Sequence, residues 1–220
     1  MRPQPRRIVY GNTRAELFVA PLSGLTADLR LFSEAERARA ARFLSGPAYD
    51  QFVLGRTFLR QALGARIGIA PERCELVELP GGRPMLANPC GLDFNLSHSG
   101  DRLFVAIVEN GVVGVDVEAV NWQQNFEAVR AAFSTAELAR FASLDARERV
   151  REFFRIWTQK ESFVKALGQG LSYPLDSLSL ETDSRGLFRD PATDEQWLIQ
   201  SWNEGEEYSF SLCLREKECA

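Results

Sequence analysis

The stretch LFVAIVENGVVGVDVE, residues 103–118, contains two apolar runs on either side of Asn110-Gly111. An Asn-Gly pair between apolar runs is the strongest short signal for a β-hairpin. Because side chains alternate along a strand, the last two valines of this stretch lie on one face, and Asp116 and Glu118 lie on the other. The sequence therefore predicts a β-hairpin that carries two carboxylates on one side of a rigid strand.

The two acids of GVDVE have two interpretations. A solvent-exposed strand face often carries acidic residues. Alternatively, carboxylates that point the same way provide the oxygen ligands with which proteins hold Mg²⁺ beside a phosphate. The second interpretation requires further ligands from elsewhere in the chain.

Glu161 provides a third carboxylate, in the helical stretch WTQKESFVKALG at 157–168. At about 100° per residue, it falls among apolar side chains that include Phe154, Trp157 and Val164. An ionised acid in such a setting is costly unless it is paired or bound to a metal. A surface pair between Glu161 and Lys165, four residues apart, is the alternative.

His98 is the single histidine of the chain and lies in FNLSHSGD, residues 94–101. Its small polar neighbours Ser97, Ser99 and Gly100 are typical of a tight turn that accepts an anion. A hydrogen-bonded structural histidine is the alternative. Combined with the acids, the pattern predicts a divalent metal site facing a phosphate, which would transfer or cleave a phosphate-linked group.

Two segments of the chain resemble each other. LFSEAERARAARF at 31–43 and AFSTAELARFASL at 132–144 each begin with a capping box, and each precedes a helical stretch that ends at a glycine, Gly64 or Gly168. The pattern predicts an α+β protein of two similar halves, residues 1–118 and 119–220, although a shared helix-forming composition would also produce it. We expect further strands at 15–19, 75–79, 177–182, 196–201 and 207–214, and a loop at 80–91.

The composition excludes several classes of protein. A net charge of −4 argues against a general nucleic-acid binder, and no apolar run is long enough for a signal peptide or a membrane span. Four cysteines without a CxxC pair, together with one histidine, argue against a zinc site. We expect a cytoplasmic protein with reduced thiols and no membrane contact.

FNLSHSG, GVDVE and FFRIWTQKESFVKALGQGL, in this order and spacing, resemble the signature of the Sfp-type 4′-phosphopantetheinyl transferases. The family pattern (V/I)G(V/I)D, followed some forty residues later by (F/W)xxKE(S/A)xxK, matches Val113–Asp116 and Trp157–Lys165. The N-terminal half resembles the family more loosely, through LFSEAERARAARF, VLGRTFLR and the GGRP loop. The resemblance implies two similar α+β halves in one chain, with the active site at their interface.

The resemblance also implies an activity, which is transfer of 4′-phosphopantetheine from coenzyme A to a serine of an apo acyl or peptidyl carrier protein. It implies that Mg²⁺, or Mn²⁺ in its place, binds to Asp116, Glu118 and Glu161. The residues that it implies for coenzyme A are His98 with Ser97, Lys165, Lys160, Arg83 near the nucleotide, and Arg37 or Arg39 at the 3′-phosphate. The implied catalytic residues are Glu161, Lys165 and His98, with Glu161 as the candidate general base.

The carrier protein is the expected partner, and we expect the enzyme to be a monomer. Trp122 and Phe126, in the segment AVNWQQNFEAVRAA, either anchor an acidic carrier helix or belong to the core. Two other functions stay open: a metal-dependent phosphodiesterase that uses water as nucleophile, and a non-catalytic module that binds coenzyme A or a nucleotide.

Overall fold

A computed structural model describes residues 4–43, 45–79, 82–88, 90–169, 173–180 and 184–217. Within these residues the strands form two antiparallel four-stranded sheets and one two-stranded sheet. The first sheet has the order β1-β2-β6-β5, with bounds Arg6–Tyr10, Thr13–Pro21, Arg102–Glu109 and Leu92–Ser99. The second has the order β7-β10-β9-β8, with bounds Gly111–Ala119, Tyr208–Glu216, Gln196–Glu204 and Arg185–Arg189. The two-stranded sheet pairs β3, Leu76–Glu78, with β4, Pro84–Leu86.

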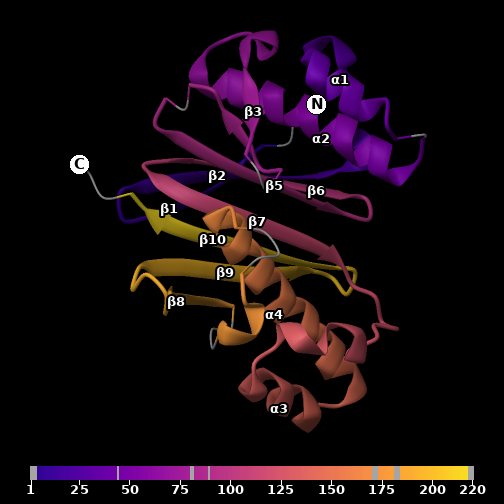
Figure 1. Ribbon diagram of the computed structural model, residues 1–220, viewed down its shortest axis with the longest axis vertical. Coiled ribbons are helices and arrows are strands. Elements are labelled where there is room, and N and C mark those ends of the chain that lie inside the picture. The colour runs from indigo at the N-terminus through magenta and orange to yellow at the C-terminus, as the bar shows by residue number, and fades with distance from the viewer. Residues whose placement is uncertain are drawn as a thin grey trace.

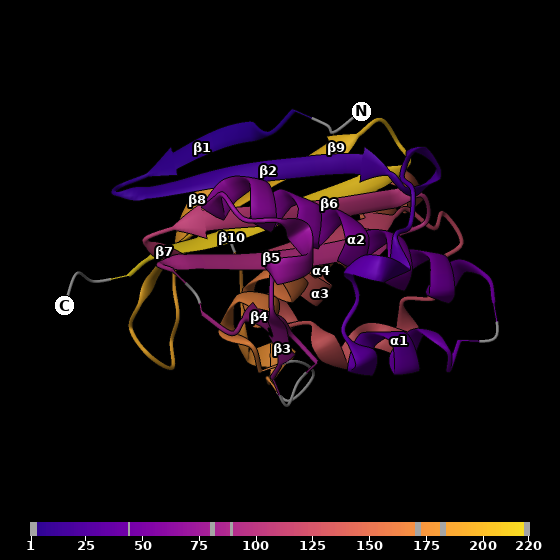
Figure 2. The same cartoon turned by 90° about the horizontal axis from the view of Figure 1, so that it is seen from above.

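The helices lie outside the two large sheets (Figure 1). The α-helices are α1 (Glu34–Ala40), α2 (Pro47–Ile67), α3 (Thr135–Ser143) and α4 (Ala146–Leu167). Short 3₁₀ turns cover η1 (Leu22–Gly24), η2 (Leu29–Leu31), η3 (Pro71–Arg73), η4 (Glu127–Ala132) and η6 (Leu175–Ser177). Figure 1 shows α1 and α2 at one end of the long axis and α3 at the other, and Figure 2 shows the strands of both sheets running across the molecule. The α+β class predicted from the sequence is confirmed.

Three apolar clusters account for this layering. One lies between the sheets and includes Phe104 from the first sheet and Val115 and Phe210 from the second. Another packs α2 on the outer face of the first sheet, and a third packs α4 on the outer face of the second. Each large sheet is therefore covered on both faces, with α2 and α4 as the outermost layers.

The predicted hairpin at 103–118 is wrong, because β6 and β7 belong to different sheets. Asn110 has a left-handed backbone with φ 56°, as an Asn-Gly turn favours, but the chain uses this turn to cross between sheets. β7 pairs with β10 instead, with Gly111 opposite Glu216. Turn chemistry is local, whereas the choice of partner strand depends on residues about 100 positions away.

The edge of β7 that faces away from β10 donates backbone hydrogen bonds to side chains of β5. Four of these side chains accept hydrogen bonds from backbone N–H groups of β7, at 2.9–3.3 Å: Asp93 from Val113, Asn95 from Val115, Ser97 from Val117 and Ser99 from Ala119. This side-chain ladder joins the two sheets and fixes β5 against β7. The tight turn predicted around His98 is wrong for Ser97–Ser99, because β5 extends to Ser99 and the turn begins at Gly100.

Most predicted element ends are confirmed. Ser33 and Ser134 cap α1 and α3 with complete capping boxes, and Gly168 ends α4 with φ 71°. In contrast, α2 continues through Gly64 to a C-cap at Gly68, which has φ 75°. Gly64 is needed for close packing, since a Cβ there would lie 2.8 Å from the Ile69 carbonyl oxygen.

The predicted strands at 15–19, 75–79, 196–201 and 207–214 correspond to β2, β3, β9 and β10, and β4 lies within the predicted loop at 80–91. The strand at 177–182 is wrong over 177–180, while 181–182 lie outside the described residues. Leu178 and Leu180 are buried in the cluster beneath α4, so their alternation reflects packing on a helix without a strand partner. The division into halves 1–118 and 119–220 stays a prediction.

Two expectations from composition concern thiols and membranes. In the described part of the chain, Cys74, Cys90 and Cys213 are free, and all but Cys90 are buried. Among the same residues, no helix combines the length and the apolar character needed to cross a membrane.

Gly114 allows α4 to pack directly on β7. A Cβ at this position would overlap the Ser162 carbonyl oxygen and lie 2.5 Å from the Ala166 nitrogen. We expect Gly114→Ala to lower the free energy of unfolding by about 1–3 kcal/mol, because the helix backbone must shift. Urea unfolding measures this loss, with Gly55→Ala as the control, since a Cβ at Gly55 meets Leu96 at an ordinary 3.4 Å. Equal stability of the two variants would contradict the close-packing argument.

Candidate active site

Strand β7 presents its two acids beneath α4, as side-chain alternation predicts. The valines on either side of Asp116 pack between the sheets, while Asp116 itself is buried on the α4 side. One of its oxygens, Oδ1, accepts hydrogen bonds from the Ser97 hydroxyl at 2.8 Å and from Lys165 Nζ at 2.5 Å. Glu118 accepts a hydrogen bond from the Ser99 hydroxyl at 2.8 Å. The alternate residues of β5 thus orient both acids.

Glu161 and Lys165 lie one turn apart on α4 and share the electrostatic field of these acids. Burial raises the pKa of Glu161, with a further rise from Asp116 and an opposing effect from Lys165. Burial and then Asp116 also raise the pKa of Glu118. Burial alone would lower the pKa of Lys165, but attraction to Asp116 and the two glutamates outweighs it and leaves that pKa raised. The structure therefore brings the three predicted acids and Lys165 together.

The acids fit a divalent cation by their chemistry. Three carboxylates repel one another in a partly buried site, and Asp116 Oδ2 is buried with no hydrogen-bond partner among the described residues. Hard cations such as Mg²⁺ bind oxygen ligands of this kind. Within the described ranges, no three His, Cys, Asp or Glu side chains already converge as a metal-binding group. The donor set is suitable, but the side chains are not arranged as a formed ligand cage.

A cavity of about 260 Å³ is lined by Lys165, the residue that donates to Asp116. Five of its described lining residues carry basic side chains, and none carries an acid: the basic ones are Arg39, Arg56, Arg83, His98 and Lys165. Burial lowers the pKa of His98, so the imidazole is predominantly neutral near pH 7. A cavity lined in this way is suited to a polyanion, such as a chain of phosphate groups.

A larger groove of about 780 Å³ lies elsewhere, between α2 and the strands β1 and β2. It is lined by residues such as Arg7, Phe58 and Arg66, and its described lining includes none of the predicted site residues. His98 and Lys165 line the smaller cavity, and Lys165 also donates to Asp116, so the smaller cavity is the candidate active site.

Arg56 was missed by the sequence analysis. It lies on α2, is only 6% exposed and has a buried Nη1 with no hydrogen-bond partner in the described part of the chain. Burial lowers the pKa of Arg56, and Glu36 and Glu78 oppose this effect. An arginine among the apolar residues of VLGRTFLR was the available signal, because a buried guanidinium requires anionic partners.

Arg83 lines the cavity and also connects its walls. Its guanidinium donates to the carbonyl oxygens of Lys165 and Ala166 at 2.8 and 2.7 Å, and to both carboxylate oxygens of Asp93 at 2.8 and 2.9 Å. It therefore ties the C-terminal end of α4 to β5. Arg37, by contrast, donates to the Phe32 carbonyl and is not among the residues that line the cavity.

Lys160 does not lie with the other candidates. Its side chain is fully buried, and Nζ donates to Glu137 at 2.6 Å and to the carbonyl oxygens of Ala132 and Leu175 at 2.9 and 2.8 Å. The placement as a phosphate partner is therefore corrected. Consecutive residues on a helix point about 100° apart, so Lys160 faces α3 while Glu161 faces β7.

The two aromatics of the segment after β7 have different environments. Phe126 packs edge-on against Phe153 with ring centroids 5.1 Å apart, so it belongs to the core. Trp122 is 40% exposed, and the guanidinium groups of Arg147 and Arg151 lie 5.4 and 5.9 Å from its ring centroid. Only Trp122 is available as a surface anchor.

Comparison with known proteins identifies the family. The 4′-phosphopantetheinyl transferase superfamily matches residues 112–213. A 4′-phosphopantetheinyl transferase of Bacillus subtilis is 28% identical over 197 residues, which cover 88% of this chain and 87% of that protein. The 4′-phosphopantetheinyl transferase HetI of Nostoc sp. is 30% identical over 77% of this chain and 75% of its own length. The 4′-phosphopantetheinyl transferase Sfp of Bacillus subtilis strain 168 is 25% identical over 84% and 83%.

Proposed function

Since the chain belongs to the 4′-phosphopantetheinyl transferase superfamily, we propose that it moves 4′-phosphopantetheine from coenzyme A to a serine of an apo acyl or peptidyl carrier protein. The second product is adenosine 3′,5′-bisphosphate. The observation that carries the proposal is the position of Lys165, which lines the cationic cavity and also donates to Asp116. Coenzyme A brings a pyrophosphate and a 3′-phosphate, which match such a cavity.

The basic residues of the cavity bind the phosphates. Lys165 and His98 lie nearest the acids and therefore contact the pyrophosphate that reacts. Arg39 and Arg56 come from α1 and α2 and contact the 3′-phosphate. Of the two alternatives, Arg37 and Arg39, we choose Arg39 because it lines the cavity and Arg37 does not. Ser97 positions other residues of the site, since its hydroxyl donates to Asp116 and accepts from Lys165.

Asp116, Glu118 and Glu161 would hold Mg²⁺, or Mn²⁺ in its place. Such an ion, when bound, supplies charge neutralisation at the transferred phosphoryl group and at the leaving bisphosphate. The carrier serine oxygen forms the new bond to phosphorus as the bond to the bridging oxygen of the pyrophosphate breaks. Lys165 stabilises negative charge on the phosphate oxygens during this exchange. Glu161 accepts the serine proton, directly or through a water molecule.

The carrier protein docks on the surface around Trp122. Arg147 and Arg151 flank the Trp122 ring and both pair with Glu206, so acidic side chains of the carrier would take the place of Glu206 there. We propose that the enzyme is a monomer, because a single chain supplies the residues of the cavity, including those from α1, α2, β5 and α4. We also propose a cytoplasmic location, as expected from the sequence.

Intact-mass spectrometry of apo carrier proteins tests the proposal. We expect incubation with this enzyme, coenzyme A and Mg²⁺ to add one phosphopantetheine to the carrier serine, and EDTA to abolish the gain. Coenzyme A cleavage without a mass gain on the carrier would indicate a phosphodiesterase. Binding of coenzyme A with neither cleavage nor transfer would indicate a binding module.

A further inference from the structure

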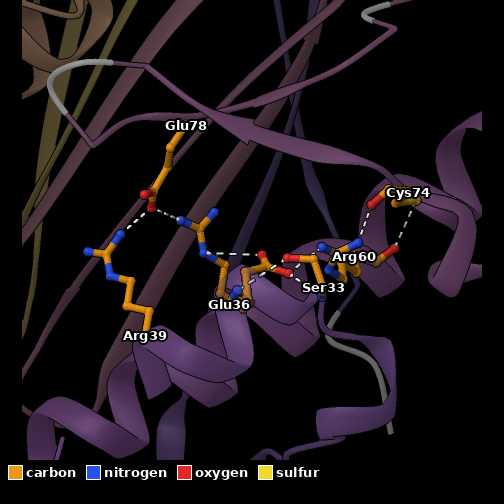
Figure 3. Close-up of polar contacts among 7 residues, drawn as sticks. Ser33, Glu36, Arg39, Arg60, Cys74 and Glu78 are labelled. Carbon is orange, nitrogen blue, oxygen red and sulfur yellow. Dashed lines mark hydrogen bonds and ion pairs between the residues drawn. The ribbon is translucent and has the colours of Figure 1, made fainter. Parts of the chain in front are cut away.

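Glu78 already occupies the two arginines assigned to the 3′-phosphate. Its Oε1 accepts from Arg56 Nη2 at 2.8 Å and also forms an ion pair with Arg39 (Figure 3). Arg39 and Arg56 both line the cationic cavity, and both also line a neighbouring cavity of about 330 Å³, to which Glu78 belongs. The carboxylate of Glu78 thus binds donors of the same two arginines from the neighbouring cavity.

The three side chains differ in their freedom to move. The side chain of Glu78 is 42% exposed and that of Arg39 is 43% exposed, whereas the side chain of Arg56 is 7% exposed. Glu78 ends β3, a three-residue strand whose partner is the equally short β4. The carboxylate can therefore turn toward solvent at little cost, while Arg56 stays in place.

The arginines are held without Glu78. Glu36 Oε1 lies 3.8 Å from Arg56 Nε, and the guanidinium groups of Arg39 and Arg56 lie 5.1 and 5.6 Å from the Phe52 ring centroid. Glu36 is fixed in turn by the Ser33 capping box and by Arg60, as Figure 3 shows. Loss of the Glu78 carboxylate would therefore free donors on Arg56, which stays buried beside Glu36, and on Arg39, which keeps its contact with the Phe52 ring.

We propose that Glu78 is an internal competitor for the phosphate subsite formed by Arg39 and Arg56, and that it sets the affinity of the enzyme for the 3′-phosphate of coenzyme A. This inference rests on the proposed function. The pyrophosphate must lie at the acids if it is to react, so the 3′-phosphate is the group left for these arginines. A carboxylate on the same guanidinium groups repels this dianion and occupies hydrogen-bond donors that it needs.

Isothermal titration with two ligands tests the proposal. We expect Glu78→Gln to lower the Kd for coenzyme A by about three- to tenfold, because a charge next to the phosphate is removed and arginine donors are released. The Kd of the variant for 3′-dephospho-coenzyme A, which lacks the 3′-phosphate, should stay within about twofold of the wild-type value. The matched control is Glu75→Gln, which removes the same charge from an exposed residue three positions earlier and should leave both constants within about twofold.

The possible results distinguish an error in the role of Glu78 from an error in the proposed function. Weaker coenzyme A binding by Glu78→Gln would overturn the inference, since Glu78 would then organise the arginines for the ligand. An equal gain for both ligands would also overturn it, because the effect would not depend on the 3′-phosphate. Failure of the wild-type enzyme to bind coenzyme A at all would instead overturn the proposed function and, with it, the inference.

Discussion

Glu161→Gln is expected to lower the rate of phosphopantetheine transfer by at least about 100-fold, because the variant loses both a metal ligand and the proposed general base. The amide has nearly the same shape as the carboxylate, so substrate access is unchanged. We expect no loss of stability. Burial raises the pKa of Glu161, which means that the fold disfavours its charged form, and a neutral amide removes that cost.

The measurement is the initial rate of carrier modification by intact mass, together with the thermal midpoint of each protein. Glu148→Gln is the matched control, since Glu148 is an exposed acid in the first turn of the same helix. We expect wild-type rates from the control. A Glu161→Gln enzyme with a rate near that of wild type would refute the assignment of Glu161, and a large fall in its thermal midpoint would show that the residue supports the fold instead.

The parts of the site that sequence predicts are those set by local periodicity. Strand alternation places Asp116 and Glu118 together, and helix periodicity places Glu161 and Lys165 on one ridge. Capping boxes at Ser33 and Ser134 fix where α1 and α3 begin, because both partners lie within four residues of each other. In each case the physical cause lies within one element.

The pairing of elements could not be predicted in this way. The Asn110 turn is compatible with a hairpin or with a change of sheet, and the outcome depends on β10, which satisfies one edge of β7, and on the side-chain ladder of β5. The ladder uses Asn95, Ser97 and Ser99, and the two serines were interpreted in the sequence as signs of a turn. Their alternation with Phe94 and Leu96 is the strand signal that the turn interpretation overlooked.

Local sequence patterns also could not predict which residues pair with the basic side chains. Arg56 was missed because the helical pattern around it does not show its partners. It pairs with Glu36 and Glu78 and lines the cationic cavity, and these neighbours come from other parts of the chain. Lys160 was assigned to the phosphates from the family resemblance. Its actual partner, Glu137, lies 23 residues earlier and was recognised only as a capping residue.

Lys160→Met is expected to lower the free energy of unfolding by about 3–5 kcal/mol, the usual cost of removing one partner from a buried ion pair. The Lys160 side chain is 0% exposed, and that of Glu137 is 5% exposed. Methionine fills a similar volume but leaves the Glu137 carboxylate without its cation, and it leaves two carbonyl oxygens, of Ala132 and Leu175, without this donor. Urea unfolding at fixed pH measures the loss.

A double variant separates the charge from the packing. Glu137→Gln keeps a carbonyl oxygen that can accept from Ser134 in the capping box, and it removes the negative charge. Combined with Lys160→Met, it should recover part of the lost stability, since no unpaired charge then remains in the interior. Strictly additive losses in this cycle would show that the two residues are not coupled. If they are coupled, the KE pair of the motif divides its roles, with Lys160 fixing α4 to α3 and η6 so that Glu161, the next residue, is held toward β7.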